Sequence, residues 1–333
     1  MGEQHGESLR EVIAELASER LAIIHAAAPS IGVELVEQIA NGVLEKTRQM
    51  LYDVYEESRA TARAANLPHW LLLVAGGFSD IIDRVTKAEG TTAAISECTL
   101  WPAPGPKGSL RLVGTWDSHA TAQNALVVVR RSPSDGDSTL ALSTAGWPMQ
   151  QGVTSRGLAF AIANLVASAP SEGTSYICAL PQIVKAATAS EASSRASALP
   201  LCSARYYIFC DSLGGFEAIE TDGRNYWYAK QPLAHTNHFI LDEAKQVEGR
   251  PSLVSNFEYR RLSASAHLGG AIGSIDALFE ALAYNDGSFH SISQYGEGRA
   301  DRTCAAFVLE PAHGRISFTV GPPGRGKAKT LTL

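Results

Sequence analysis

Cys98 is the residue of this chain whose type and position could carry the most chemistry. It lies where a helical N-terminal stretch is expected to give way to strand-like segments. If the preceding peptide bond is cut, the new terminus carries a thiol nucleophile and, in its own α-amine, a general base. The ordinary pKa values of the two groups are close, about 8 for the amine and about 8.5 for the thiol, so proton transfer between them costs little near neutral pH. The alternative is an ordinary buried cysteine that packs as a small hydrophobe.

The other cysteines and the histidines do not indicate a metal site or a disulfide framework. No CxxC pair occurs. Four scattered cysteines are expected in the core: Cys178, Cys202, Cys210 and Cys304. His235 and His238 resemble a metal pair, but residues three apart on a strand face opposite sides, and no Asp or Glu completes a set. We interpret both as structural histidines.

The composition excludes several classes of function. Of the 333 residues, 45% are apolar and 19% are charged, which is typical of a globular protein with an ample core. The formal net charge of −6 gives no basic footprint for a nucleic-acid partner. The longest apolar run, residues 70–75, is far shorter than the roughly 20 residues that cross a bilayer, so no membrane partner is expected. The polar N-terminus lacks the apolar region of a secretory signal, which favours a cytoplasmic location.

Residues 1–97 are predicted to be helical. Ser8-Leu9-Arg10-Glu11 has the form of a capping box, and apolar residues at helical spacing follow it. Pro29-Ser30 ends this helix, and a second apolar stripe covers residues 35–44. A third helix is expected at about 47–65 and a fourth at about 69–86, with Asn66-Leu67-Pro68 between them.

From about residue 93 the pattern changes to strands separated by turn residues. The first group of predicted strands covers residues 94–95, 110–115, 125–129, 139–143 and 158–162. Two helices within 174–199 precede strands at 205–210, 216–221 and 225–229, and helices at 252–267 and 274–284 precede strands at 304–309 and 316–320. This order is α+β and not strict βαβ alternation, so we predict a single domain with a helical N-terminal section.

Six short motifs occur in a characteristic order along the chain. They are His5-Gly6, Cys98-Thr99, Gly114-Thr115-Trp116-Asp117, Ser155-Arg156-Gly157-Leu158-Ala159, His235-Thr236-Asn237-His238 and Asp301-Arg302-Thr303. Together they resemble those of the acyl-coenzyme A:6-aminopenicillanic-acid acyltransferase family, also called peptidase C45, within the N-terminal nucleophile (Ntn) hydrolases. The His-Thr-Asn-His tetrapeptide is the most specific match, because it is unchanged in the family. The chain departs from the family at Glu97, usually glycine, at Thr115, usually asparagine, and at Asp301, usually serine.

The resemblance implies a four-layer αββα sandwich of two antiparallel sheets flanked by helices. It also implies self-cleavage between Glu97 and Cys98. The products would be a helical α chain of residues 1–97, which stays docked, and a catalytic β chain of residues 98–333. The implied partners are a small-molecule amide substrate and the cleaved N-terminal segment. The oligomeric state stays open, with a homo-oligomer as one alternative.

The resemblance also implies roles for individual residues. Cys98 would carry the acyl group as a thioester, Asn237 would donate to the oxyanion and Asp117 would orient the α-ammonium. Arg302 would hold a carboxylate, either that of Asp117 or one on a substrate. The structural alternatives are a strand-end turn for Asn237, a strand cap for Asp117 and a surface salt bridge for Arg302. The implied substrate-binding residues are Thr99, Thr115, Trp116, Ser155 and His235.

The predicted activity is hydrolysis of a linear amide of a small N-acylated amine or amino acid, with no metal and no organic cofactor. One alternative is an acyl-coenzyme-A-dependent N-acyltransferase. Another, of a different class, is an unprocessed, non-catalytic amide-binding protein; the side chain of Glu97 favours it, because it would crowd the bond to be cut. A glycine-rich stretch at residues 321–328 nearly matches a phosphate loop, but Ala328 replaces the required Ser or Thr and only five residues follow. We interpret that stretch as a solvated tail.

Overall fold

The structure is a computed structural model that describes residues 1–91, 98–105, 108–134, 136–270, 273–288, 290–296 and 301–333. Its helices are α1 (Gly2–Ser8), α2 (Arg10–Ala27), α3 (Val33–Met50), α4 (Tyr52–Ala64), α5 (His69–Gly76), α6 (Phe78–Glu89), α7 (Tyr176–Ile183), α8 (Ala189–Ser197), α9 (Val254–Gly270) and α10 (Ile275–Leu282). Its strands are β1 (Cys98–Pro104), β2 (Leu110–His119), β3 (Leu126–Arg131), β4 (Thr139–Thr144), β5 (Gln151–Thr154), β6 (Leu158–Asn164), β7 (Arg205–Asp211), β8 (Phe216–Thr221), β9 (Tyr226–Tyr228), β10 (Asp301–Glu310), β11 (Arg315–Val320) and β12 (Lys329–Thr332).

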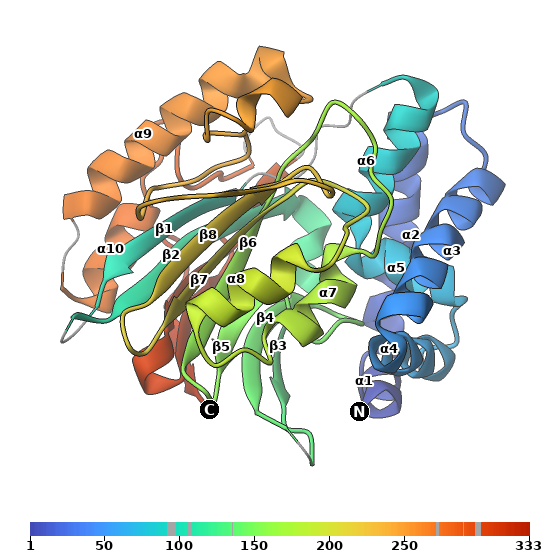
Figure 1. The fold of residues 1–333 in the computed structure, drawn as a ribbon, viewed down its shortest axis with the longest axis horizontal. Helices are drawn as coiled ribbons and strands as arrows, with labels where there is room; N and C mark the ends of the chain where they lie inside the picture. Colours follow the sequence, from blue (N-terminus) through green and yellow to red (C-terminus); the bar gives the residue numbers. More distant parts are fainter. Residues whose placement is uncertain (92–97, 106–107, 135, 271–272, 289, 297–300) are drawn as a thin grey trace.

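The strands form two antiparallel sheets that pack face to face (Figure 1). One sheet has the order β1-β2-β10-β11-β12 and the other the order β3-β4-β5-β6-β7-β8-β9. Alternate residues of both sheets meet between them, among them Leu112 and Phe307 from the first sheet and Leu142 and Ile208 from the second. The period-2 pattern of the strands therefore fills a core between two sheets, as sheet packing requires.

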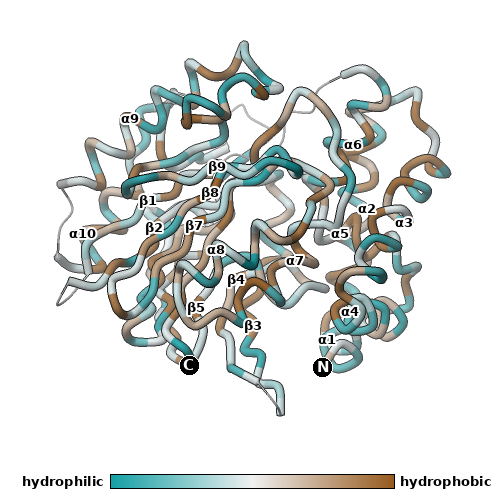
Figure 2. The backbone as a smooth tube through the Cα atoms, viewed as in Figure 1, coloured by the Kyte–Doolittle hydropathy of each residue, from teal (hydrophilic) through white to brown (hydrophobic). Residues whose placement is uncertain are grey.

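Helices cover the outer face of each sheet and complete the four layers. Helices α9 and α10 pack Leu268 and Leu282 on Val113 and Val308 of the five-stranded sheet. Figure 2 shows hydrophobic and hydrophilic residues alternating along α9, as expected for a helix with one buried face. Helices α7 and α8 and the N-terminal helices share a core with the other face of the seven-stranded sheet. The αββα sandwich predicted from the sequence is confirmed.

The N-terminal helices pack as part of this outer layer (Figure 1). The indole Nε1 of Trp147, just before β5, donates a hydrogen bond to the Leu72 carbonyl of α5 at 3.0 Å. Asp80 of α6 pairs with Arg205 of β7, and both side chains are almost fully buried. Apolar burial and a buried ion pair thus join residues 1–91 to the sheet.

Several element boundaries differ from those predicted. The prediction that a capping box at residues 8–11 starts the first helix is wrong, because the chain is already helical from Gly2 and Ser8 is the last residue of α1. The third predicted helix straddles the junction of α3 and α4, and the fourth divides at Gly77 into α5 and α6. The glycine-rich stretch predicted to be solvated is buried at residues 321–323 and exposed at 324–328, and the residues after it pair as β12 with β11, with Thr330 opposite Ser317. The strand predicted at residues 94–95 lies outside the described residues.

Among the residues that the structure describes, no helix combines the length and the apolar character needed to cross a membrane.

Candidate active site

Cys98 is the first residue of β1, at the edge of the five-stranded sheet, and its side chain is buried. Its neighbour on one side is Trp116 of β2. On the other side, Leu100 forms an antiparallel bridge with His235, with both backbone hydrogen bonds at 2.9 Å. Cys98 comes two residues before Leu100 and Asn237 two residues after His235, so the antiparallel register places Asn237 opposite Cys98. The backbone N–H of Cys98 donates to Oδ1 of Asn237 at 2.6 Å.

The Cys98 thiol is kept neutral in this form of the chain. Burial and, to a smaller extent, the negative charge of Asp117 raise the pKa of the thiol to about 12, although the positive charge of Arg260 acts in the opposite direction. A thiol with this pKa is protonated near neutral pH, and the thiolate is the reactive form. Attack on an amide would therefore require a base close to the sulfur.

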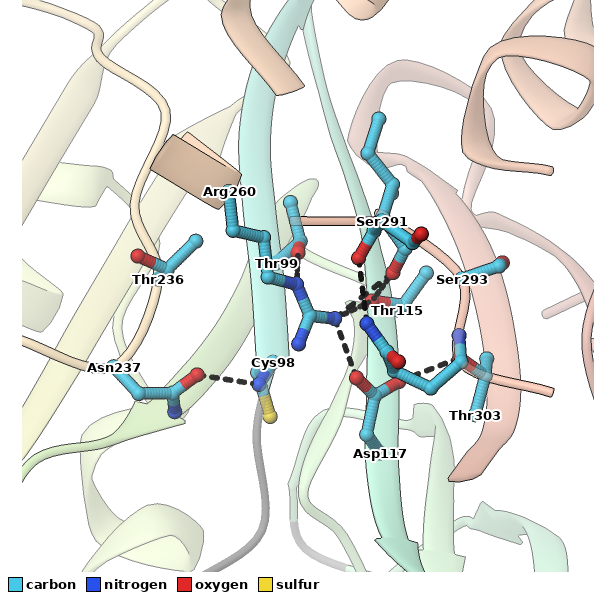
Figure 3. A network of polar contacts seen from close by, with 12 residues as sticks. Cys98, Thr99, Thr115, Asp117, Thr236, Asn237, Arg260, Ser291, Ser293 and Thr303 are labelled. Atoms are coloured by element: carbon cyan, nitrogen blue, oxygen red, sulfur yellow. Dashed lines mark hydrogen bonds and ion pairs between the residues drawn. The ribbon is translucent and has the colours of Figure 1, made fainter. Parts of the chain in front are cut away.

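Asp117 and Arg260 form a fully buried ion pair beside the cysteine (Figure 3). Asp117 lies on β2, and its second carboxylate oxygen accepts a hydrogen bond from Thr303 Oγ1 at 2.7 Å. Arg260 lies on α9 and also donates to the Ile292 carbonyl at 2.8 Å. The arginine on Asp117 is thus Arg260, where the sequence had indicated Arg302. Arg302, on β10, pairs in register with Ser118, and its buried Nε has no hydrogen-bond partner among the described residues.

Thr99 and Thr115 lie side by side in the β1–β2 ladder and hold Arg260. Arg260 Nε donates to Thr99 Oγ1 at 3.0 Å, and its Nη2 contacts Thr115 Oγ1 at 3.5 Å. Strand alternation directs these hydroxyls away from the core between the sheets, into which Cys98 and Trp116 pack. The structure therefore places the two threonines, predicted to bind substrate, as supports for the buried arginine.

A small cavity of about 40 Å³ adjoins Cys98. Its walls come from both sheets and from the N-terminal helices: Arg20, Gly76, Phe78, Ser79, Trp116, Ser118, Gln150, Gln151, Ile162, Asn164, Tyr176 and Arg205. Two amide nitrogens in these walls, Nδ2 of Asn164 and Nε2 of Gln151, are buried without a hydrogen-bond partner in the described chain. Buried donors are normally paired, so two unpaired donors in the cavity beside Cys98 suit a ligand oxygen.

His235 and His238 each have an acidic partner. His235 Nε2 lies 2.8 Å from Glu220 Oε1, and the ring stacks on Tyr206 at 3.6 Å. His238 Nε2 lies 3.0 Å from Glu258 Oε2. The sequence predicted that the two rings face opposite sides of a strand, but their centres lie 6.5 Å apart. Only His235 makes a strand-like bridge, so strand alternation does not continue to His238. His235 is fully buried and does not line the cavity, contrary to its predicted place in substrate binding.

Two other predicted residues lie elsewhere. Ser155 is exposed in the turn between β5 and β6, where its hydroxyl accepts from the Ser138 backbone N–H at 3.1 Å. The cavity is lined by Gln151 at the opposite end of β5, so the motif that suggested Ser155 identified the right hairpin but the wrong end. Glu97 lies outside the described residues. Among those described, no group of three His, Cys, Asp or Glu side chains gathers as a metal site.

Sequence reasoning missed Arg260, Asn164 and Gln151. Arg260 had a readable signal, because it follows Phe257 by three residues and precedes Ala264 by four, on the buried face of α9. A charged residue on an apolar helical face is rare unless it is paired. Asn164 and Gln151 gave no such signal, since each ends or begins a strand where polar residues are common.

Comparison with known proteins gives one family match. The sequence model of the family described as acyl-coenzyme A:6-aminopenicillanic acid acyl-transferase matches residues 105–325, which begins seven residues after Cys98. No curated protein matches the chain.

Among solved structures, the chain is similar to a variant of the conjugated bile acid hydrolase from Clostridium perfringens, with 11% identity, a TM-score of 0.47, and 71% of this chain and 97% of that chain covered. It is similar to the penicillin V acylase from Agrobacterium tumefaciens, with 14% identity, a TM-score of 0.46, and coverage of 71% and 86%. It is also similar to the Caenorhabditis elegans ortholog of N-acylethanolamine-hydrolyzing acid amidase, with 14% identity, a TM-score of 0.45, and coverage of 71% and 99%.

Proposed function

Because this chain belongs to the acyl-coenzyme A:6-aminopenicillanic acid acyl-transferase family, and is thus an amide-cleaving or acyl-transferring enzyme, we propose that it is a self-processing amidohydrolase with Cys98 as nucleophile. The proposed substrate is a linear amide of a small N-acylated amine or amino acid. The hydrogen bond of 2.6 Å between the Cys98 nitrogen and Asn237 Oδ1 carries this proposal. Cleavage before Cys98 would turn that nitrogen into an α-amine already held beside the thiol.

The first stage is self-cleavage. The Cys98 thiol adds to the Glu97 carbonyl carbon, the C–N bond breaks, and the thiol proton passes to the departing Cys98 nitrogen. The thioester that joins Glu97 to the sulfur is then hydrolysed by water, which frees the Glu97 carboxyl group and regenerates the thiol. The raised pKa of the uncut thiol implies that this stage is slow compared with a reaction of a free thiolate.

The second stage uses the freed amine. The α-amine accepts the thiol proton, the thiolate attacks the amide carbonyl of the substrate, and the leaving amine departs with a proton from the α-ammonium. Water then hydrolyses the acyl thioester. Asn237 Oδ1 would accept a hydrogen bond from the α-amine and so direct its lone pair towards the sulfur. The sequence had indicated Asn237 as the oxyanion donor, but its Nδ2 donates to the Asn164 carbonyl at 3.0 Å. We assign the oxyanion instead to Asn164 Nδ2 and Gln151 Nε2, whose unpaired donors line the cavity.

The N-terminal segment is proposed to stay docked after cleavage. Its helices bury apolar residues, among them Ile13, Leu16 and Leu72, in the same core as Phe160 and Phe209 of the sheet. At about 40 Å³ the cavity can hold only a few waters, whereas ligand pockets span roughly 300–1,000 Å³. The substrate therefore enters only once the walls have moved, and cutting the chain at Cys98 would release one of their attachments.

Denaturing electrophoresis and an amide screen test this proposal together. The wild-type chain should give fragments of about 10 and about 25 kDa, in proportion to the 35.4 kDa of the whole, and Cys98→Ala should give one band. Cys178→Ala, a matched change of a fully buried cysteine outside the cavity, should still be cleaved. An intact wild-type chain that also hydrolyses no N-acyl amine, N-acyl amino acid or lactam would instead support the unprocessed amide-binding protein.

A substitution at the amide that holds Cys98 tests the assignment of roles. Asn237→Ala should slow hydrolysis by about 10²- to 10³-fold in kcat, the range for loss of one aligned polar group in such a site. Gln151→Ala should lower kcat by a similar factor with a smaller effect on self-cleavage, because the Cys98 nitrogen keeps its contact with Asn237. A kcat that is unchanged in Gln151→Ala would remove this residue from the oxyanion site.

A second candidate is an acyl-coenzyme-A-dependent N-acyltransferase, because the family to which the chain belongs takes its name from an acyl-transfer reaction. The acyl group on Cys98 would then pass to an amine instead of to water. Kinetics with a thioester donor and a panel of amines separate the two activities. Acyl transfer that outpaces hydrolysis of both thioester and amide would favour the transferase.

A further inference from the structure

Arg20 of α2 is a buried arginine on the apolar face of its helix. It continues the buried series Ile13, Leu16 and Ala17 and is itself only 3% exposed. Its Nε donates to Nε2 of His119 at 3.1 Å. One terminal nitrogen donates to the Ala75 carbonyl. The guanidinium carbon lies 5.1 Å from the centre of the Phe78 ring, so the group is fixed on several sides.

No carboxylate among the described residues neutralises Arg20 by an ion pair. Its hydrogen-bond partner His119 does not do so, because burial lowers the pKa of His119 to about 3 and the ring stays neutral. Because Arg20 can only donate, Nε2 of His119 accepts, and in the neutral ring the proton lies on the other nitrogen, 2.8 Å from Thr121 Oγ1. Burial also lowers the pKa of Arg20, to about 10, so the guanidinium is still charged near neutral pH.

Arg205 provides the internal comparison. It lines the same cavity and is also fully buried, but it pairs with Asp80 and with Asn164 Oδ1 at 2.7 Å. A buried charge without a partner costs several kcal/mol, and proteins usually remove such charges. One arginine of this cavity thus has an ion-pair partner, whereas the other forms no ion pair with an acidic side chain that the structure describes, and Glu19 acts on its charge without direct contact.

Arg20 and Cys98 line the same cavity, where the walls also supply the apolar ring of Trp116. We propose that Arg20 binds a carboxylate of the substrate, so that the enzyme prefers amides that carry a negative charge near the scissile bond. This inference rests on the proposed amidohydrolase function and narrows its substrate class. The carboxylate belongs either to an N-acyl amino acid, on the amine side, or to the amide of a dicarboxylic acid, on the acyl side.

A ligand-binding test needs no turnover. Formate is small enough for the present cavity and carries a carboxylate, and formamide is its neutral counterpart of similar size. Formate should raise the Tm of the Cys98→Ala protein in a concentration-dependent way, as a ligand of the folded state does, and formamide should not. Arg20→Met should abolish the response to formate. In Arg111→Met, which removes a buried arginine paired with Glu310 outside the cavity, the response should persist.

The unliganded Tm separates binding from a structural role. Arg20→Met should match or exceed the wild-type Tm without formate, because the variant removes an uncompensated buried charge. A Tm that falls in Arg20→Met while the formate response is unchanged would overturn the proposal. So would equal responses to formate and formamide in the parent protein.

Kinetics with three amides identify which side carries the charge. N-Butyrylglycine has its carboxylate on the amine side, the methylamide of glutaric acid has it on the acyl side, and N-butyrylmethylamine has none. One charged amide should exceed the neutral one in kcat/KM by about 10- to 100-fold, the factor of a charge-assisted hydrogen bond, and Arg20→Met should remove that preference through KM. If all three amides react equally with the wild-type protein, the proposed binding of a carboxylate by Arg20 is refuted, whereas the proposed amidohydrolase activity is supported. If none reacts and the chain stays intact, the amidohydrolase fails, and the formate response alone decides whether Arg20 binds anions.

Discussion

Breaking the ion pair between Asp117 and Arg260 should destabilise the protein far more than replacing both partners. Both side chains are 0% exposed, so Asp117→Asn removes a carboxylate that is in direct contact with a buried guanidinium. The contacts of Arg260 with the Thr99 hydroxyl and with the Ile292 carbonyl are made to dipoles, which carry no full negative charge. We expect the free energy of unfolding to fall by about 3–5 kcal/mol in Asp117→Asn and by a similar amount in Arg260→Met.

The double variant Asp117→Asn/Arg260→Met should recover much of this loss, because it removes both charges of the buried ion pair together. A coupling energy of at least about 2 kcal/mol is expected from the double-mutant cycle. The same Asp117→Asn change removes one negative charge near Cys98 and should lower the pKa of its thiol. Asp242→Asn, which breaks an exposed pair with Lys245, should leave the unfolding free energy near that of wild type.

Urea unfolding of the four members of the cycle, followed by circular dichroism, measures these free energies. The Cys98→Ala background keeps every sample uncut and so comparable. The rate of Cys98 alkylation, measured against pH in the Asp117→Asn chain that still has its cysteine, measures the thiol pKa. The reasoning is refuted if both single changes cost less than about 1 kcal/mol, or if their effects simply add in the double variant.

The remaining predictions concern acid stability and packing. Burial lowers the pKa of His69 and of His238 to about 4 from an ordinary 6.5, so the unfolded chain takes up protons first as the pH falls. The unfolding free energy should therefore drop between about pH 6.5 and pH 4, and urea titrations that give equal values at pH 7 and pH 4.5 would contradict this cause. In Gly76→Ala the new Cβ would lie 1.8 Å from the Trp147 ring, and a Tm loss equivalent to about 1–3 kcal/mol or more is expected. Gly42 lies in the middle of α3, and a Cβ there would have no atom within 4 Å. Gly42→Ala should therefore raise the free energy of unfolding by about 0.5–1 kcal/mol, and a decrease would contradict a helix at this position.

The sequence by itself was sufficient for the strand pattern and, through the family resemblance, for the sandwich, and it singled out Cys98 as the candidate nucleophile. Strand periodicity and turn residues after position 93 were sufficient for the sheets, because a period of two is a local property of the backbone. The motif around Asn237 pointed to a site shared with Cys98 across 139 positions. Chain folding had to bring the two together, and the bridge between Leu100 and His235 does so.

The tertiary structure alone decided which charges meet. The sequence pointed to Arg302 as a partner of Asp117, and only the docking of α9 on the sheet selects Arg260. It also decided that Arg20, from the helical segment, lines the cavity of a cysteine 78 positions later in the chain. Long-range pairing depends on how amphipathic faces pack in three dimensions, and local sequence patterns reveal which face is buried but not which element covers it.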